Sequence, residues 1–217
     1  MSLNFYTLLN LVTYTAALFG PAILVNSLSL NFQQGLVLQI IFYVIGAALM
    51  LLYHPELKDA LIVEEKQKKV SLKKAIGEGF IGIAIVTAVQ GLANYLDIFI
   101  SGQLPVSENT QNILAMIQEN MGFILLVSIA GPIMEELFFR RALIGFFGNH
   151  FNFWTGAIVS SFLFYLAHQD GHFLLYFSMG LTLALLYRST GRILTSIIAH
   201  CGMNTLVILL NLILTQF

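Results

Sequence analysis

Apolar residues are gathered into seven runs along the chain, separated by short polar stretches. The runs lie at Phe5–Leu28, Leu36–Tyr53, Ala75–Ile100, Met121–Phe147, Phe151–Ala167, Phe173–Tyr187 and Ile193–Leu214. A helix needs about 20 apolar residues to cross the hydrocarbon core of a bilayer, so most of these runs are long enough to span it. The fifth and sixth are shorter. The pattern predicts an all-α, polytopic transmembrane helical bundle of about seven spans, within a range of six to eight.

The composition supports a membrane protein. Of 217 residues, 58% are hydrophobic and 10% are charged, whereas charged residues make up roughly 25% of an average soluble domain. Because no repeat and no long linker interrupts the runs, residues 1–217 are expected to form a single membrane domain. The first run lacks the basic segment of a signal peptide and is expected to be retained. Nucleic acid is not an expected partner, because no helix carries a basic face.

Basic residues set the expected orientation in the cell membrane. Six of the ten Lys and Arg residues lie within Lys58–Lys74, and Ser101–Asn120 contains none. Loops rich in Lys and Arg remain on the cytoplasmic side, so the Lys58–Lys74 loop and the N-terminus are expected there and Ser101–Asn120 outside. Arg140, Arg141, Arg188 and Arg192 then also fall toward the inner side.

The fourth run contains two adjacent acids, Glu135 and Glu136, followed by Arg140. An ionisable residue inside a span costs roughly 2.5–3.5 kcal/mol on insertion scales, so each needs a reason to be there. Successive helical residues point about 100° apart, so the two acids are expected to have different roles. Glu136 shares a helix face with Arg140, which suits an ion pair. Glu135 is left to face an internal cavity as a candidate general base.

Three further polar residues lie in later runs. His168 follows the fifth run, and His200 and Asn204 are one turn apart on one face of the seventh. If the bundle brings them to Glu135, such a set can activate a water and stabilise an oxyanion. The rise of about 1.5 Å per residue opposes this, because it places His200 nearer the inner face and His168 nearer the outer face.

The order Glu-Glu-x-x-x-Arg, Phe-x-x-x-His and His-x-x-x-Asn resembles the CAAX protease and bacteriocin-processing (Abi) family of intramembrane endopeptidases. The likeness covers residues 119–205, which would form the catalytic core. It implies that Glu135 activates water with His168 as its partner. His200 and Asn204 would then stabilise the oxyanion or bind a metal, while Glu136 and Arg140 support the site.

The resemblance leaves the metal question open. A zinc ion would take His168 and His200, with Glu135 or Asn204 adding an oxygen. An asparagine amide is a poor zinc ligand but a good donor to an oxyanion, which favours the metal-free alternative. Cys201 has no basic partner on its own face and is not an expected nucleophile, and the Asp170–Gly171 pair separates His172 from His168.

The expected function is hydrolysis of a peptide bond in a membrane-associated peptide or protein, in bacteriocin or peptide processing or in self-immunity. Two alternatives belong to other classes. An ion-coupled transporter would also bury carboxylates and histidines, although the chain lacks the repeat common in transporters. A non-catalytic immunity or regulatory protein would use the cavity only for binding. The polar residues could also serve as structural acid–base pairs and interhelical hydrogen bonds.

The orientation can be tested by cysteine labelling in intact cells, with Cys201 replaced by serine. A cysteine placed at Lys66 should resist an impermeant thiol reagent, because its loop is expected to face the cytoplasm, and one at Ser107 should react. Labelling of Lys66→Cys with protection of Ser107→Cys would reverse the orientation.

Overall fold

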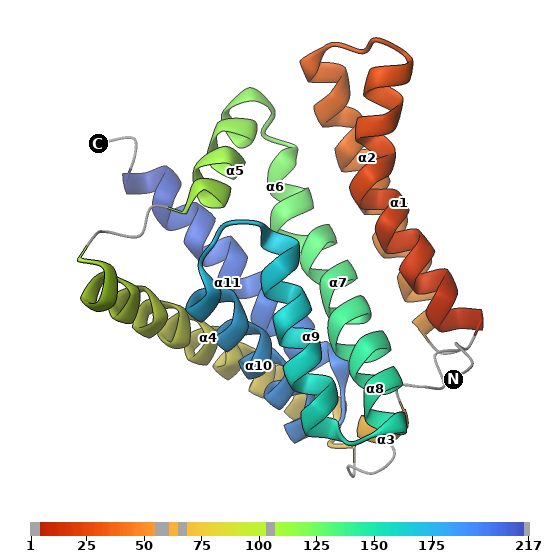
Figure 1. Cartoon of the computed structure of the whole chain (residues 1–217), viewed down its shortest axis with the longest axis vertical. Helices are drawn as coiled ribbons and strands as arrows, with labels where there is room; N and C mark the ends of the chain where they lie inside the picture. Colours follow the sequence, from red (N-terminus) through yellow and green to blue (C-terminus); the bar gives the residue numbers. More distant parts are fainter. Residues whose placement is uncertain (1–4, 55–60, 65–68, 103–106, 215–217) are drawn as a thin grey trace.

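The computed structural model describes residues 5–54, 61–64, 69–102 and 107–214, which are helical apart from short turns and contain no strand (Figure 1). The long helices are α1 (Phe5–Ser27), α2 (Phe32–Tyr53), α4 (Leu72–Ser101), α9 (Phe153–His168), α10 (Phe173–Thr190) and α11 (Ile193–Leu214). The shorter ones are α3 (Leu61–Glu64), α5 (Glu108–Glu119), α6 (Phe123–Leu125), α7 (Gly131–Glu135) and α8 (Ile144–His150). Two π-helical segments, η3 (Leu126–Ala130) and η4 (Glu136–Leu143), join α6, α7 and α8 into one rod.

The predicted all-α membrane bundle is confirmed. In the described part of the chain, five helices are long and apolar enough to cross a membrane, namely α1, α2, α4, α10 and α11. The predicted fourth run is the rod from α6 to α8, and the fifth is α9, which has 16 residues. All seven runs are therefore helical, and the two that miss the length criterion are the interrupted rod and the short α9.

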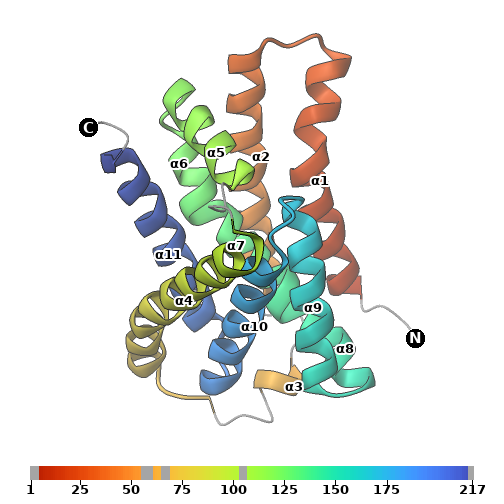
Figure 2. The ribbon, with the colours of Figure 1, turned by 60° about the vertical axis from the view of Figure 1, so that its left-hand side comes forward.

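The helices pack as two groups on either side of the rod. Helices α1 and α2 form a hairpin on one side, and α4, α10 and α11 pack together on the other (Figures 1 and 2). Small residues allow the closest approaches. A Cβ atom at Gly180 of α10 would lie 3.1 Å from Cα of Ser161 in α9, and one at Gly202 of α11 would lie 2.2 Å from Cδ1 of Ile83 in α4.

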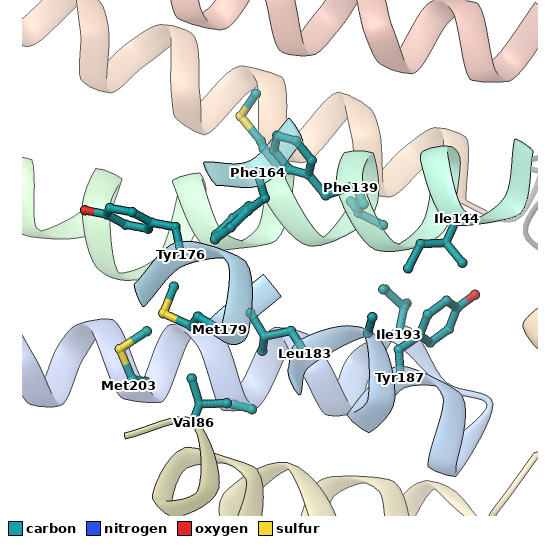
Figure 3. Close-up of a cluster of buried hydrophobic side chains, with 14 of the residues drawn as sticks. Val86, Phe139, Ile144, Phe164, Tyr176, Met179, Leu183, Tyr187, Ile193 and Met203 are labelled. Carbon is teal, nitrogen blue, oxygen red and sulfur yellow. The ribbon is translucent and has the colours of Figure 1, made fainter. Parts of the chain in front are cut away.

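Large apolar side chains fill the space between the rod, α9, α10 and α11. Phe164 of α9 is fully buried, and its ring meets that of Phe139 edge to face with centroids 5.2 Å apart (Figure 3). Met179 and Leu183 of α10 and Met203 of α11 complete this core. It fixes the relative positions of the rod, α9 and α11, the three segments that carry the candidate catalytic residues.

The connection between α9 and α10 lies near the middle of the molecule, well short of the end reached by the α1–α2 connection (Figure 1). Gln169 and Gly171 adopt positive φ angles of 51° and 74°, which end α9 and reverse the chain. At about 1.5 Å per residue, the 16 residues of α9 are about 24 Å long, less than the roughly 30 Å of a hydrocarbon core. The turn therefore brings His168 inward. It removes the difference in depth between His168 and His200 that straight, full-length spans would impose.

The π-helical segment η3 changes the hydrogen bonding before Pro132. The amide of Gly131 bonds to the carbonyl of Leu126, five residues back. In the same register the carbonyl of Val127 would need an amide from position 132, and proline has none. Nδ2 of Asn204 in α11 donates to this carbonyl at 2.9 Å. An interhelical bond thus replaces the backbone bond that proline removes.

The predicted ion pair between Glu136 and Arg140 is confirmed. Nη2 of Arg140 lies 3.4 Å from Oε1 of Glu136, and the two side chains are 1% and 0% exposed. The guanidinium also lies over the ring of Phe164, 4.3 Å from its centroid, which adds a cation–π contact. Both charges are thus compensated inside the bundle.

The neighbouring Arg141 attaches the lysine-rich loop to the rod. Its Nε donates to Glu64 at 2.8 Å, and Lys69 and the hydroxyl of Tyr187 also reach that carboxylate. Burial alone would raise the pKa of Glu64, but Arg141 and Lys69 outweigh it and lower that pKa. Arg141 also donates to the carbonyl of His54, and burial together with the Arg141 charge lowers the pKa of His54 to about 4.

Removing one member of the buried pair should destabilise the protein. Arg140→Ala leaves Glu136 buried without its cation, and we expect a loss of about 3–5 kcal/mol in the free energy of unfolding. Thermal unfolding in detergent measures this. The control is Arg188→Ala. The guanidinium of Arg188 lies over the rings of Phe153 and Trp154, so its removal should lower the free energy of unfolding much less.

The double variant Glu136→Gln/Arg140→Met keeps the volume and removes both charges, so it should be more stable than Arg140→Ala. Equal melting temperatures for Arg140→Ala and Arg188→Ala would contradict a stabilising role for the pair.

Candidate active site

His200 lies between the two acids and connects α11 to the rod. Its Nδ1 is 2.9 Å from Oε1 of Glu136, and its Nε2 is 3.7 Å from Oε2 of Glu135. The side chain is 1% exposed. Because a carboxylate only accepts hydrogen bonds, Nδ1 carries the proton that is donated to Glu136. This leaves Nε2 as the nitrogen that faces Glu135.

Glu135 is the more accessible acid, at 21% exposure against 0% for Glu136. The difference arises where α7 passes into η4, because the two adjacent side chains leave the rod in different directions. Glu135 lines a cavity of about 670 Å³, and Glu136 does not. The expected division is confirmed: one acid is buried in an ion pair and the other faces a cavity.

His168 lines the same cavity from the end of α9. Its Nδ1 is 2.7 Å from the carbonyl oxygen of Phe164, and a carbonyl can only accept, so Nδ1 is the donor. In the neutral ring Nε2 is then the basic nitrogen. The ring of Phe164 contacts both histidines, with centroid distances of 4.4 Å to His168 and 5.9 Å to His200.

Asn204 also lines the cavity. Because one of its amide hydrogens is used by the carbonyl of Val127, the second hydrogen and Oδ1 remain for other partners. The structure therefore brings all four predicted residues to one cavity: Glu135, His168, His200 and Asn204.

Two details differ from the expected arrangement. The ion pair that the structure gives to Glu135 is with His200, whereas pairing of Glu135 with His168 stays a prediction. His172 also lines the cavity, and its Nδ1 lies 3.6 Å from Oδ2 of Asp97 in α4. The thiol of Cys201 bonds to the carbonyl of Ile129, and its exclusion as a nucleophile stays a prediction.

Sequence reasoning missed the tyrosines of the cavity wall. Tyr14 of α1, Tyr43 of α2 and Tyr176 of α10 all line it. The ring of Tyr176 stacks on His168 with centroids 4.0 Å apart and an interplanar angle of 25°. Single tyrosines in apolar runs have no motif, so only the packing of the helices could identify them.

The side chains as arranged do not fit a resident zinc ion. In the ranges that the structure describes, no three His, Cys, Asp or Glu side chains come together as a metal-binding group. One nitrogen of each histidine is engaged by another acceptor, Glu136 for His200 and the Phe164 carbonyl for His168. A structural or catalytic zinc site needs at least three protein ligands around one point.

Comparison with known proteins agrees with the motifs. The family model for type II CAAX prenyl endopeptidase Rce1-like proteins matches residues 117–206. The chain is 30% identical over 224 residues to the membrane-embedded CAAX protease MroQ of Staphylococcus aureus (strain USA300), which covers 95% of this chain and 89% of MroQ.

A second relative is YdiL of Bacillus subtilis (strain 168), with 39% identity over 146 residues, or 67% of this chain and 60% of YdiL. The chain thus spans less than two thirds of the length of that relative. A third, the UPF0177 protein YbdI of Lactococcus lactis subsp. lactis (strain IL1403), is 29% identical over 140 residues. No solved structure is significantly similar to the chain. The relationship to MroQ extends over nearly the whole of both proteins, and the chain belongs to the CAAX protease and bacteriocin-processing family of intramembrane endopeptidases.

Proposed function

We propose that this protein hydrolyses a peptide bond of a membrane-associated peptide or protein by means of a water molecule that Glu135 activates. The observation that carries the proposal is the position of Glu135. It is the one acid among the described residues that line the cavity, and His168, His200 and Asn204 line the cavity with it. A carboxylate in a partly enclosed cavity can take a proton from water while a bound carbonyl is attacked.

The proton balance of the reaction is simple. Glu135 accepts a proton from water, and the hydroxide oxygen forms a bond to the carbonyl carbon of the substrate. The C–N bond then breaks, and the proton held by Glu135 passes to the leaving nitrogen, either directly or through Nε2 of His200, 3.7 Å away. Nε2 of His168 accepts a hydrogen bond from the attacking water and orients it.

The tetrahedral intermediate carries a negative oxygen that needs hydrogen-bond donors. The second amide hydrogen of Asn204 is one. The other is Nε2 of His200, once it has received from Glu135 the proton that came from the water. Losing one such donor typically costs a factor of 10²–10³ in rate. Glu136 and Arg140 hold His200 in place and take no direct part.

The cavity wall suggests the kind of substrate. Eight carboxamide side chains line it and, among the described lining residues, there is no Lys or Arg. They are Gln39, Gln90, Asn94, Asn109, Gln111, Asn112, Asn204 and Asn211. Carboxamides both donate and accept, so they can pair with an extended peptide backbone. A peptide segment with uncharged side chains fits this wall better than one that relies on ion pairs.

Several residues of α5 line the cavity and none of α3 does. Figures 1 and 2 show α5 and α3, a helix within the lysine-rich loop, toward opposite ends of the bundle. If that loop is cytoplasmic, as the basic residues indicate, the substrate is cut in the outer half of the membrane.

Replacing the proposed base gives the direct test of function. Glu135→Gln keeps the shape and removes the basic oxygen, so cleavage of a library of uncharged fluorogenic peptides by the purified protein should fall by at least about 10²-fold. Its matched control is Glu78→Gln, because Glu78 pairs with Lys74 away from the cavity. Both variants should accumulate in the membrane as the native protein does. Retained cleavage in Glu135→Gln would reject Glu135 as the base, and no cleavage by any form would favour a non-catalytic binding protein.

Metal dependence is tested separately. We expect the purified protein to keep full activity after treatment with a strong chelator, because the donors do not gather around one point. Metal content measured on the stripped sample serves as the control. Activity that is lost and then restored by zinc or cobalt, with about one metal per chain, would establish the metal-dependent alternative.

A further inference from the structure

The turn between α9 and α10 is attached to the helix that covers the cavity. Oδ2 of Asp170 accepts a hydrogen bond from the hydroxyl of Ser107 at 2.7 Å, and its Oδ1 accepts one from the amide of Asn109 at 3.3 Å. Ser107 is the N-cap of α5, so Asp170 adds a negative charge at a helix N-terminus, where the free amides favour it.

The same carboxylate also holds Tyr176. The tyrosine hydroxyl donates to Oδ2 of Asp170 at 2.9 Å. The Tyr176 ring is 5% exposed and stacks on the imidazole of His168 at a centroid distance of 4.0 Å. A continuous series of contacts therefore runs from Asp170 through Tyr176 to His168.

The orientation of the His168 ring depends on contacts with Phe164 and Tyr176. The bond from Nδ1 to the Phe164 carbonyl fixes one nitrogen, and the ring of Phe164 meets the imidazole at a tilt of 58°, an arrangement that still lets the imidazole rotate about the bonded nitrogen. The stacked face of Tyr176 removes that freedom, and Asp170 fixes the ring of Tyr176 in turn. We propose that Asp170 and Tyr176 are positioning residues that orient His168 for catalysis. This inference rests on the proposed function of the cavity.

The ring of Tyr176 and its hydroxyl have different roles: the ring stacks on His168, and the hydroxyl bonds to Asp170. Tyr176→Leu removes the stacked ring, and misplacement of a catalytic group by about 1 Å can cost up to about 10²-fold in rate. We expect Tyr176→Leu to lower kcat by more than about 10-fold with little change in KM. Tyr176→Phe keeps the ring and loses the bonds that the hydroxyl makes with Asp170 and Asn109, so it should recover most of that loss.

A double-mutant cycle tests whether Asp170 acts through Tyr176. Asp170→Ala should lower kcat in the native background but have no further effect in Tyr176→Phe, because the bond between them is already absent. Ser107→Ala removes the bond from Ser107 to Asp170 and leaves the bond from Tyr176 to Asp170, so it is the control for loosening of α5. Additive effects of Asp170→Ala and Tyr176→Phe on kcat would overturn the proposal, even if Tyr176→Leu does not fold.

A readout other than cleavage separates this inference from the proposed function. The rate at which diethyl pyrocarbonate modifies His168, measured by mass spectrometry, should rise in Tyr176→Leu and in Asp170→Ala relative to the exposed His150. Unchanged modification of His168 together with a native kcat in Tyr176→Leu would overturn the positioning role while Glu135-dependent cleavage stands. Changed modification in a protein that cleaves nothing would instead reject the proposed function and leave only a packing role for Tyr176.

Discussion

The arrangement of the bundle depends on the buried charge of Glu136. A carboxylate with no exposed surface is tolerated only if cations or hydrogen-bond donors reach it, and here Arg140 and His200 do so from the rod and from α11. The pairing therefore fixes the rotation of α11 about its axis relative to the rod. That rotation in turn sets where Nε2 of His200 lies and how close it is to Glu135. The buried acid thus determines where His200 lies beside the functional acid.

A second constraint acts on the same two segments through the backbone. Pro132 leaves the carbonyl of Val127 without an amide, and the side chain of Asn204 supplies the missing donor. Orphan carbonyls inside a membrane protein are satisfied by neighbouring helices. Asn204, which belongs to the family motif, therefore also connects the rod to α11. Loss of Asn204 would leave the buried carbonyl of Val127 without a hydrogen-bond donor and would also remove a donor from the cavity. The effects of this loss on stability and on rate must therefore be measured separately.

The sequence predicted the helices well because apolar runs of membrane length are a strong local signal. The ends of α2, α4 and α11 lie within a few residues of the predicted runs. The pairing of Glu136 with Arg140 was also predictable, since it depends on spacing within one helix. The π-helical segments were not, because their hydrogen-bond register depends on neighbours such as Asn204. The stacking of Tyr176 on His168 joins residues across a turn whose depth follows from the short α9, and no local pattern encodes it.

The short α9 also has a consequence for the surrounding lipid. Helices of 16 and 30 residues, α9 and α4, belong to the same bundle and must share one bilayer. The longer helix accommodates by the oblique course seen in Figures 1 and 2, whereas the shorter one leaves hydrocarbon chains without a matching apolar surface. Such hydrophobic mismatch is relieved by thinning of the bilayer at a cost of a fraction of a kcal/mol per Å. The acyl-chain length of the host membrane therefore affects the depth at which the α9–α10 turn lies.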